Sequence, residues 1–175
     1  MKYSEVRDLM KPGDVIAFGG NGFISNIIKL ATESVVSHVG IIMRSEDSRN
    51  YIIESNGKKK GMTGVQVWLM STRLEEYDGN VWWLPMRVEF DRELFINFLM
   101  LQEGKEYDAP QAIGSAFDGV PDCQENLDRL FCSELVTAAL EYVGVISDIN
   151  ASEMTPADVC RFDIYEDAVQ IKKIF

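Results

Sequence analysis

Short runs of apolar residues, separated by polar turns, set the pattern of this chain. Runs rich in β-branched and aromatic residues predict strands over residues 14–18, 37–43, 51–54, 65–69 and 81–88. Apolar residues at helical spacing predict helices over residues 4–10, 23–32, 91–103, 109–117 and 131–143. The polar stretches 44–50 and 119–128 are expected to be loops, and the glycine-rich stretch 19–22 a flexible one.

The predicted helix ends carry capping residues. Asp91 is a suitable N-cap for the helix over 91–103, and Gly144 ends the helix over 131–143. The sequence Thr155-Pro156-Ala157-Asp158 predicts a further helix start, with a hydroxyl cap, a proline at the first position and an acid in the first turn. The apolar residues expected to face inward from the helix over 91–103 are Leu94, Phe95, Phe98, Leu99 and Leu101.

Consecutive strands joined by short links favour a mainly antiparallel sheet with helices packed against it. The sequence therefore predicts an α+β fold, in which residues 162–175 close the sheet. A length of 175 residues fits one domain of ordinary size, so residues 1–175 are expected to form a single domain.

Composition and charge narrow the possible functions. A formal net charge of −11 argues against a general nucleic-acid binder, which would show a basic stripe. No stretch approaches the roughly 20 apolar residues of a membrane span, and residues 1–8 lack the apolar core of a signal peptide. A cytoplasmic location is therefore expected. Cys123, Cys132 and Cys160 are an odd number without metal-binding spacing, so we expect free thiols and neither metal nor cofactor.

His38 is the only histidine, and so the one obvious proton acceptor near neutral pH. Glu54 lies in the next predicted strand. If the two strands pair antiparallel with a position sum of 94, Glu54 is the diagonal neighbour of His38 on the same face. A sum of 92 would pair them directly, and an odd sum would separate them. Asn56 is an alternative partner, because an amide can also orient an imidazole.

Cys132 lies near the start of the helix over 131–143. A helix N-terminus concentrates unpaired N–H groups and partial positive charge, which favour the nucleophilic thiolate. Cys132 also fits the apolar face of this helix, and Asp128 is an alternative cap that would place the thiol a full turn inside it. Thiol, imidazole and carboxylate together would form a triad.

Seven segments occur in an order that matches a known family. They span residues 12–16, 24–32, 37–41, 53–55, 104–108, 131–135 and 155–158. Together they resemble the YiiX/YebB-like group of NlpC-type cysteine hydrolases. In papain the cysteine precedes the histidine, whereas in this permuted branch the histidine strand comes first. The order His38, Glu54, Cys132 is the order that the resemblance requires.

The resemblance implies a circularly permuted papain-like fold and a cysteine hydrolase that cleaves a peptide or amino-acid amide through a thioester on Cys132. His38 would then shuttle the proton, Glu54 would orient His38, and Tyr107 and Ser37 would contact the substrate. Related permuted members act on lipid acyl groups, so an acyl hydrolase or acyltransferase is the second hypothesis. A binding module that keeps the fold without turnover is the third.

Overall fold

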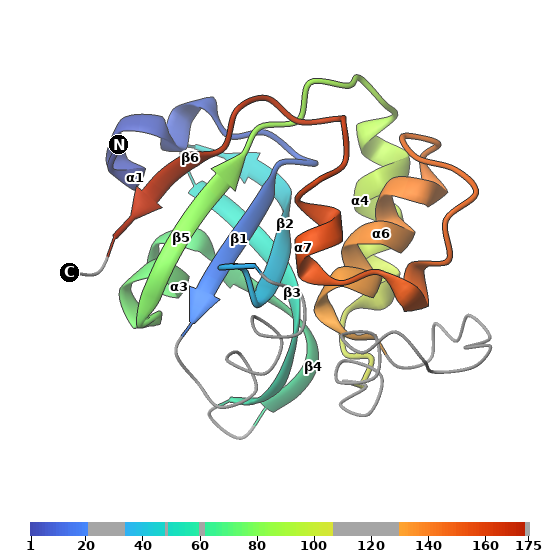
Figure 1. Cartoon of the computed structure of the whole chain (residues 1–175), viewed down its shortest axis with the longest axis horizontal. Coiled ribbons are helices and arrows are strands. Elements are labelled where there is room, and N and C mark those ends of the chain that lie inside the picture. Colours follow the sequence, from blue (N-terminus) through green and yellow to red (C-terminus); the bar gives the residue numbers. More distant parts are fainter. Residues whose placement is uncertain (21–33, 48, 60–61, 107–129, 174–175) are drawn as a thin grey trace.

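The structure is a computed structural model that describes residues 1–20, 34–47, 49–59, 62–106 and 130–173. Within these residues one antiparallel six-stranded sheet has the order β4-β3-β2-β1-β5-β6 (Figure 1). The strands are β1 (Val15–Gly20), β2 (His38–Glu46), β3 (Arg49–Lys59), β4 (Met62–Leu69), β5 (Gly79–Leu84) and β6 (Val169–Lys172). The predicted α+β class with a mainly antiparallel sheet is confirmed.

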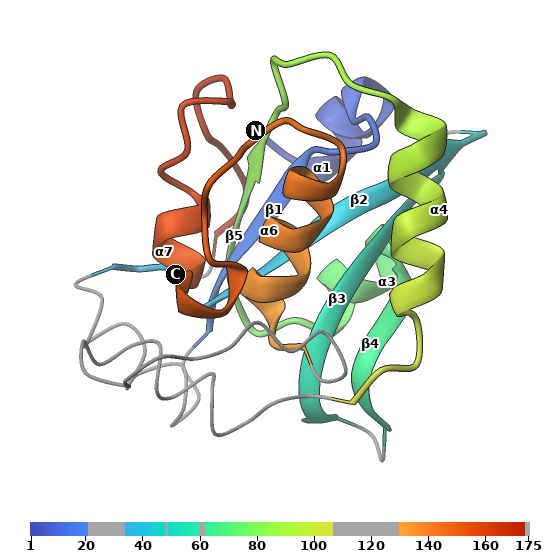
Figure 2. The same ribbon diagram turned by 90° about the vertical axis from the view of Figure 1, so that its right-hand side faces the viewer.

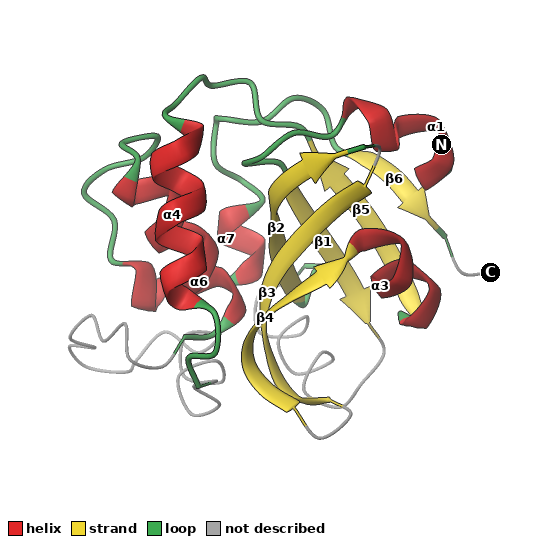
Figure 3. Cartoon of the chain, turned by 180° about the vertical axis from the view of Figure 1, so that it is seen from behind, coloured by secondary structure: helices red, strands yellow, loops and turns green. Residues whose placement is uncertain are grey.

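Helices cover both faces of this sheet (Figures 1 and 3). One face carries α4 (Arg92–Gln102), α6 (Cys132–Tyr142) and α7 (Pro156–Val159), and the other carries α1 (Tyr3–Val6) and α3 (Met70–Glu76). The 3-10 turns η1 (Arg7–Leu9) and η2 (Ala151–Glu153) follow α1 and precede α7. Figure 2 shows α6 and α4 in front of the sheet, where the two helices contact each other.

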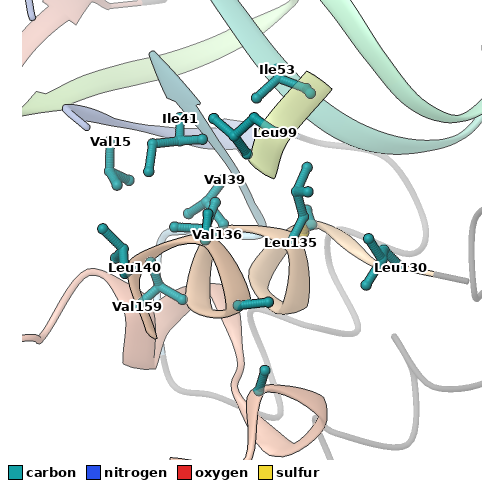
Figure 4. Close-up of a cluster of buried hydrophobic side chains, with 14 of the residues drawn as sticks. Val15, Val39, Ile41, Ile53, Leu99, Leu130, Leu135, Val136, Leu140 and Val159 are labelled. Carbon is teal, nitrogen blue, oxygen red and sulfur yellow. The ribbon is translucent and has the colours of Figure 1, made fainter. Parts of the chain in front are cut away.

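Successive residues of a strand point to opposite faces, so the sheet builds two apolar cores. The core between the sheet and α6 includes Val15, Val39, Ile41, Ile53, Leu99, Leu135 and Val136 (Figure 4). The core beside α3 includes Ile16, Phe18, Ile42, Ile52, Met70 and Leu74. Cross-strand partners share a face, so His38, which pairs with Phe18, points toward the α3 side of the sheet.

The strand predictions are largely confirmed, with three corrections. The strand predicted over 81–88 ends at Leu84. The loop predicted over 44–50 is wrong, because β2 and β3 continue to a tight turn in which Asp47 has a positive φ of 49°. Gly19 and Gly20 belong to β1 rather than to a flexible loop. The helices predicted over 23–32 and 109–117 and the loop over 119–128 lie outside the described residues. Strand β6 closes the sheet beside β5, as predicted.

The helix starts and ends agree with the capping residues. Asp91 accepts a hydrogen bond of 2.9 Å from the Leu94 N–H, and Thr155 caps α7 in the same way. The inward positions predicted for Leu94 and Leu101 are wrong, since these side chains are 40% and 76% exposed. A narrower stripe of α4, formed by Phe95, Phe98 and Leu99, is buried instead. No helix in the described part of the chain combines the length and apolarity needed to span a membrane.

Candidate active site

The register of β2 against β3 decides whether Glu54 reaches His38. Ile41 pairs with Ile53, which is a position sum of 94, one of the two even sums that the sequence left open. A bulge between residues 42 and 44 changes the register only on the side away from His38. Glu54 is therefore the diagonal neighbour of His38 on the same face, as predicted.

Gly40 provides the space that this diagonal contact needs. A Cβ atom at Gly40 would lie 2.7 Å from Ile52 Cδ1 and 3.1 Å from Glu54 Cβ. Within the described strands, the residue pairs of β2 and β3 end at Ile41, so Gly40 lies just beyond the last pair. A glycine at this point lets the Glu54 side chain approach β2 and reach the histidine.

Glu54 is fully buried and is bonded from two sides. Its Oε2 lies 2.6 Å from His38 Nε2. Arg73 of α3 donates from Nε to Oε1 and from Nη2 to Oε2, the latter over 3.3 Å. Burial favours the neutral carboxyl group, but His38 and Arg73 outweigh it and lower the pKa of Glu54 from 4.5 to about 2. Glu54 is therefore ionised at neutral pH.

Helix α6 begins at Cys132, with Phe131 as its N-cap, so the thiol lies in the first turn. The alternative in which Asp128 caps the helix is wrong. The buried Glu134 carboxylate accepts the Phe131 N–H over 3.4 Å, and the Ser55 hydroxyl of β3 donates to the Leu130 carbonyl. These bonds fix the start of α6 against the strand that carries Glu54.

The Cys132 thiol and the His38 imidazole lie close enough that each shifts the pKa of the other. Since Nε2 faces Glu54, Nδ1 is the ring nitrogen left for the sulfur. Burial raises the pKa of the Cys132 thiol, but His38 and the backbone N–H groups of Val39 and Ser133 outweigh it and lower that pKa. The thiolate is thereby stabilised inside a buried site.

The same contacts act on the imidazole in the opposite direction. Burial lowers the pKa of His38, but Cys132 and Glu54 outweigh it and raise that pKa from 6.5 to about 9. Only 16% of the His38 side chain is exposed, and its ring packs against the Phe18 ring at a centroid distance of 5.4 Å. The raised pKa of the imidazole and the lowered pKa of the thiol both favour a thiolate–imidazolium pair.

The site joins the two sides of the sheet. Cys132 belongs to the α6-side core, whereas His38, Glu54 and Arg73 lie on the α3 side. They meet near the start of β2, beyond the last residue pair of β2 with β3, where the backbone N–H of Val39 helps to lower the pKa of the Cys132 thiol.

The other predicted site residues are placed less directly. Ser37 is buried. Its backbone N–H and its hydroxyl both donate to the Phe18 carbonyl oxygen, over 2.9 Å and 3.4 Å. The contact of Ser37 with a substrate stays a prediction. Tyr107 lies outside the described residues. Glu54, not Asn56, bonds His38 Nε2, and Asn56 Nδ2 has no hydrogen-bond partner within the described part of the chain.

The sequence analysis missed Arg73. A signal for it exists: Met70, Arg73, Leu74 and Tyr77 follow helical spacing along one face, which puts a lone cation inside an apolar stripe. A cation in such a place needs a buried partner of opposite charge. In the structure that partner is Glu54.

Fold and site together define an α+β protein with a buried cysteine–histidine–glutamate cluster. No protein-family model and no curated protein matches the chain. Among solved structures, the chain is similar to the crystal structure of the metalloprotein YiiX (DUF1105) from Escherichia coli O157:H7, with a TM-score of 0.59 and 20% identity over 78% of this chain and 67% of that chain. This likeness shows a YiiX-like fold.

The described ranges bring together no group of three or more His, Cys, Asp or Glu side chains that could hold a metal ion. Both oxygens of Glu54 are already engaged by Arg73 and His38. A cation at this carboxylate would have to displace them.

Replacing Ser55 by alanine is expected to lower the free energy of unfolding by about 1–3 kcal/mol, because the buried Leu130 carbonyl loses its donor. Urea denaturation of Ser55→Ala measures this loss. The matched control is Ser45→Ala on β2, since Ser45 is exposed and its loss should change stability by less than about 0.5 kcal/mol. Equal stability of the two variants would contradict an anchoring role for Ser55.

Proposed function

We propose that this protein is a cysteine hydrolase that cleaves an amide bond through a thioester on Cys132. The observation that carries the proposal is the buried chain of contacts from Cys132 through His38 to Glu54 at the start of α6. Thiol, base and orienting carboxylate lie in the order that nucleophilic catalysis needs. The three residues come from three separate elements: His38 from β2, Glu54 from β3 and Cys132 from α6.

The chemistry follows from these positions. The Cys132 thiolate attacks the carbonyl carbon of the substrate, and the carbonyl electron pair moves to oxygen. When the tetrahedral intermediate collapses, the C–N bond breaks and His38 gives its proton to the leaving amine. Water then attacks the thioester and gives a proton to His38. The C–S bond breaks, the acid is released, and the thiolate of Cys132 and the imidazolium of His38 are restored. Backbone N–H groups in the first turn of α6 are the donors that we propose for the oxyanion.

We also propose that the fold is papain-like and circularly permuted. Two observations support this: the fold is similar to that of YiiX, and the histidine strand β2 precedes the cysteine helix α6. Cys132 is almost completely buried against the sheet. This is the arrangement expected when the helix that carries the nucleophile packs on the strand that carries the histidine.

The test is turnover of a panel of amino-acid amides, short peptides and acyl esters by the purified protein. We expect release of an amine, a thioester adduct of Cys132 in intact-mass spectra, and loss of both in Cys132→Ala. The matched control is Cys160→Ala, which removes a thiol whose pKa is raised by burial to about 12 and should leave turnover unchanged. Turnover that survives in Cys132→Ala would sink the proposal.

The same assay separates the other two hypotheses. Release of a fatty acid with no amine would favour a lipid-directed acyl hydrolase or acyltransferase with the same triad. No turnover, together with partner binding that survives in Cys132→Ala, would favour a binding module. In either case the proposed amide specificity would be wrong.

A further inference from the structure

Arg73 is a buried cation placed next to the triad. It is 3% exposed, and its guanidinium carbon lies 4.7 Å from the centroid of the Phe18 ring and 4.9 Å from that of Tyr77. Its Nε–H and Nη2–H groups bond to both oxygens of Glu54. Two aromatic rings and a two-point ion pair therefore hold the guanidinium in one orientation.

The groups that face this cluster come from every element around it. They are His38 on β2, Glu54 on β3, Cys132 on α6, Cys160 at the end of α7, and Tyr77 and Asp78 after α3. Burial raises the pKa of both Tyr77 and Cys160, so these two are neutral at neutral pH, and Asp78 is exposed. The buried charges then alternate in sign: guanidinium, carboxylate, imidazolium and thiolate.

This alternation has a physical consequence. The imidazolium of His38 lies between two anions, Glu54 and the Cys132 thiolate. Without the guanidinium, the buried cluster would carry one net negative charge, and burial penalises such a charge strongly. The cluster would then hold its protons more tightly and the thiolate would form at higher pH.

We propose that Arg73 is a positioning residue for the nucleophile: it neutralises and orients Glu54, so that a second anion, the Cys132 thiolate, can form beside the same imidazole. This inference rests on the proposed function for its catalytic meaning. Its test needs no substrate. Arg73 acts through Glu54 and does not touch the reacting atoms.

The experiment measures the rate of iodoacetamide labelling of Cys132 against pH in the full chain, by mass spectrometry of the Cys132 peptide. Arg73→Met keeps a similar stem but removes the charge, and is expected to move the acid limb of the profile up by about one pH unit, roughly a tenfold loss on that limb. Arg73→Lys keeps the positive charge and should restore most of the labelling rate that Arg73→Met loses on the acid limb. Rates are expressed per folded molecule. Partial unfolding therefore reduces the amount of protein that is measured and does not change the pH at which the labelling rate falls.

The Glu54→Gln background supplies the decisive control. If Arg73 acts mainly through Glu54, adding Arg73→Met to Glu54→Gln moves the acid limb by clearly less than the shift of about one pH unit expected in the wild-type background. The double variant carries no buried charge at either position, so this comparison holds even if Arg73→Met alone does not fold. A further upward shift of about one pH unit in the double variant would overturn the inference, as would an unshifted limb in folded Arg73→Met or a fully shifted limb in Arg73→Lys.

The two proposals fail in different ways. Wild-type Cys132 that labels no faster than Cys160 near pH 6 would contradict the thiolate–imidazolium pair, and with it both proposals. Reactive wild-type Cys132 with an unchanged Arg73→Met profile would overturn the role of Arg73 alone.

Discussion

Replacing His38 by alanine is expected to slow iodoacetamide labelling of Cys132 by about 100-fold or more near pH 6. In the wild type, the imidazolium holds the thiol pKa below its usual value. Without it, burial returns the pKa to roughly 8.5 or above, and the thiolate fraction at about pH 6 falls below about one per cent. Labelling rate against pH, read at each cysteine, measures the change.

The pH dependence follows from the two partners. In the wild type the labelling rate should stay level up to the pKa of His38 at about 9, where the imidazolium loses its proton. In His38→Ala it should rise about tenfold per pH unit up to the higher thiol pKa. Labelling of Cys160 in the same sample is the internal control. Asn56→Ala is the matched variant, because Asn56 was the alternative partner of His38, and it should leave the Cys132 profile unchanged. Indifference of Cys132 to His38→Ala would mean that the triad is not assembled.

Glu54→Gln is expected to lower the free energy of unfolding by about 3–5 kcal/mol, because it leaves the Arg73 guanidinium buried without its counter-charge. Arg73→Met should cost a similar amount for the converse reason. The double variant, in which both charges are gone, should be more stable than either single variant. Urea unfolding of the four proteins at neutral pH measures the coupling. Simple addition of the two losses would show that Glu54 and Arg73 do not act as a pair.

Linkage gives this second prediction a pH signature. The pKa of Glu54 is lowered, so its contribution to stability is fully present above pH 4.5 and is lost as pH falls through about 2. The pKa of His38 is raised, so its contribution is fully present below pH 6.5 and is lost as pH rises through about 9. The Glu54→Gln variant should lack the acid-side loss. An unchanged acid-side slope in the urea midpoints of that variant would contradict the assignment.

Substitutions on the exposed side of α4 should not affect the buried site. Leu94 and Leu101 project from α4 away from the core, and their replacement by polar residues should leave labelling of Cys132 unchanged. Phe95 and Leu99, on the buried stripe of the same helix, are fully buried between α4 and the sheet.

The sequence by itself determined most elements and the identity of three site residues. Period-two runs and helix caps are local, so the strands of the sheet and the helix ends at Asp91, Gly144 and Thr155 could be predicted from neighbours in the chain. His38 stood out as the only histidine, and Cys132 as a thiol at a helix start. Even position sums place Glu54 beside His38, so the sequence limited the possible registers of the two strands but did not select one of them.

Only the tertiary structure decided how these residues meet. The register of β2 on β3, the end of their ladder at Ile41 and the space at Gly40 depend on packing between layers, which no local pattern contains. Arg73 lies 19 residues from Glu54 on a different element, and its pairing is visible only when α3 is placed on the sheet. Charge pairing and desolvation act through space rather than along the chain, so the protonation state of the triad is a property of the folded protein.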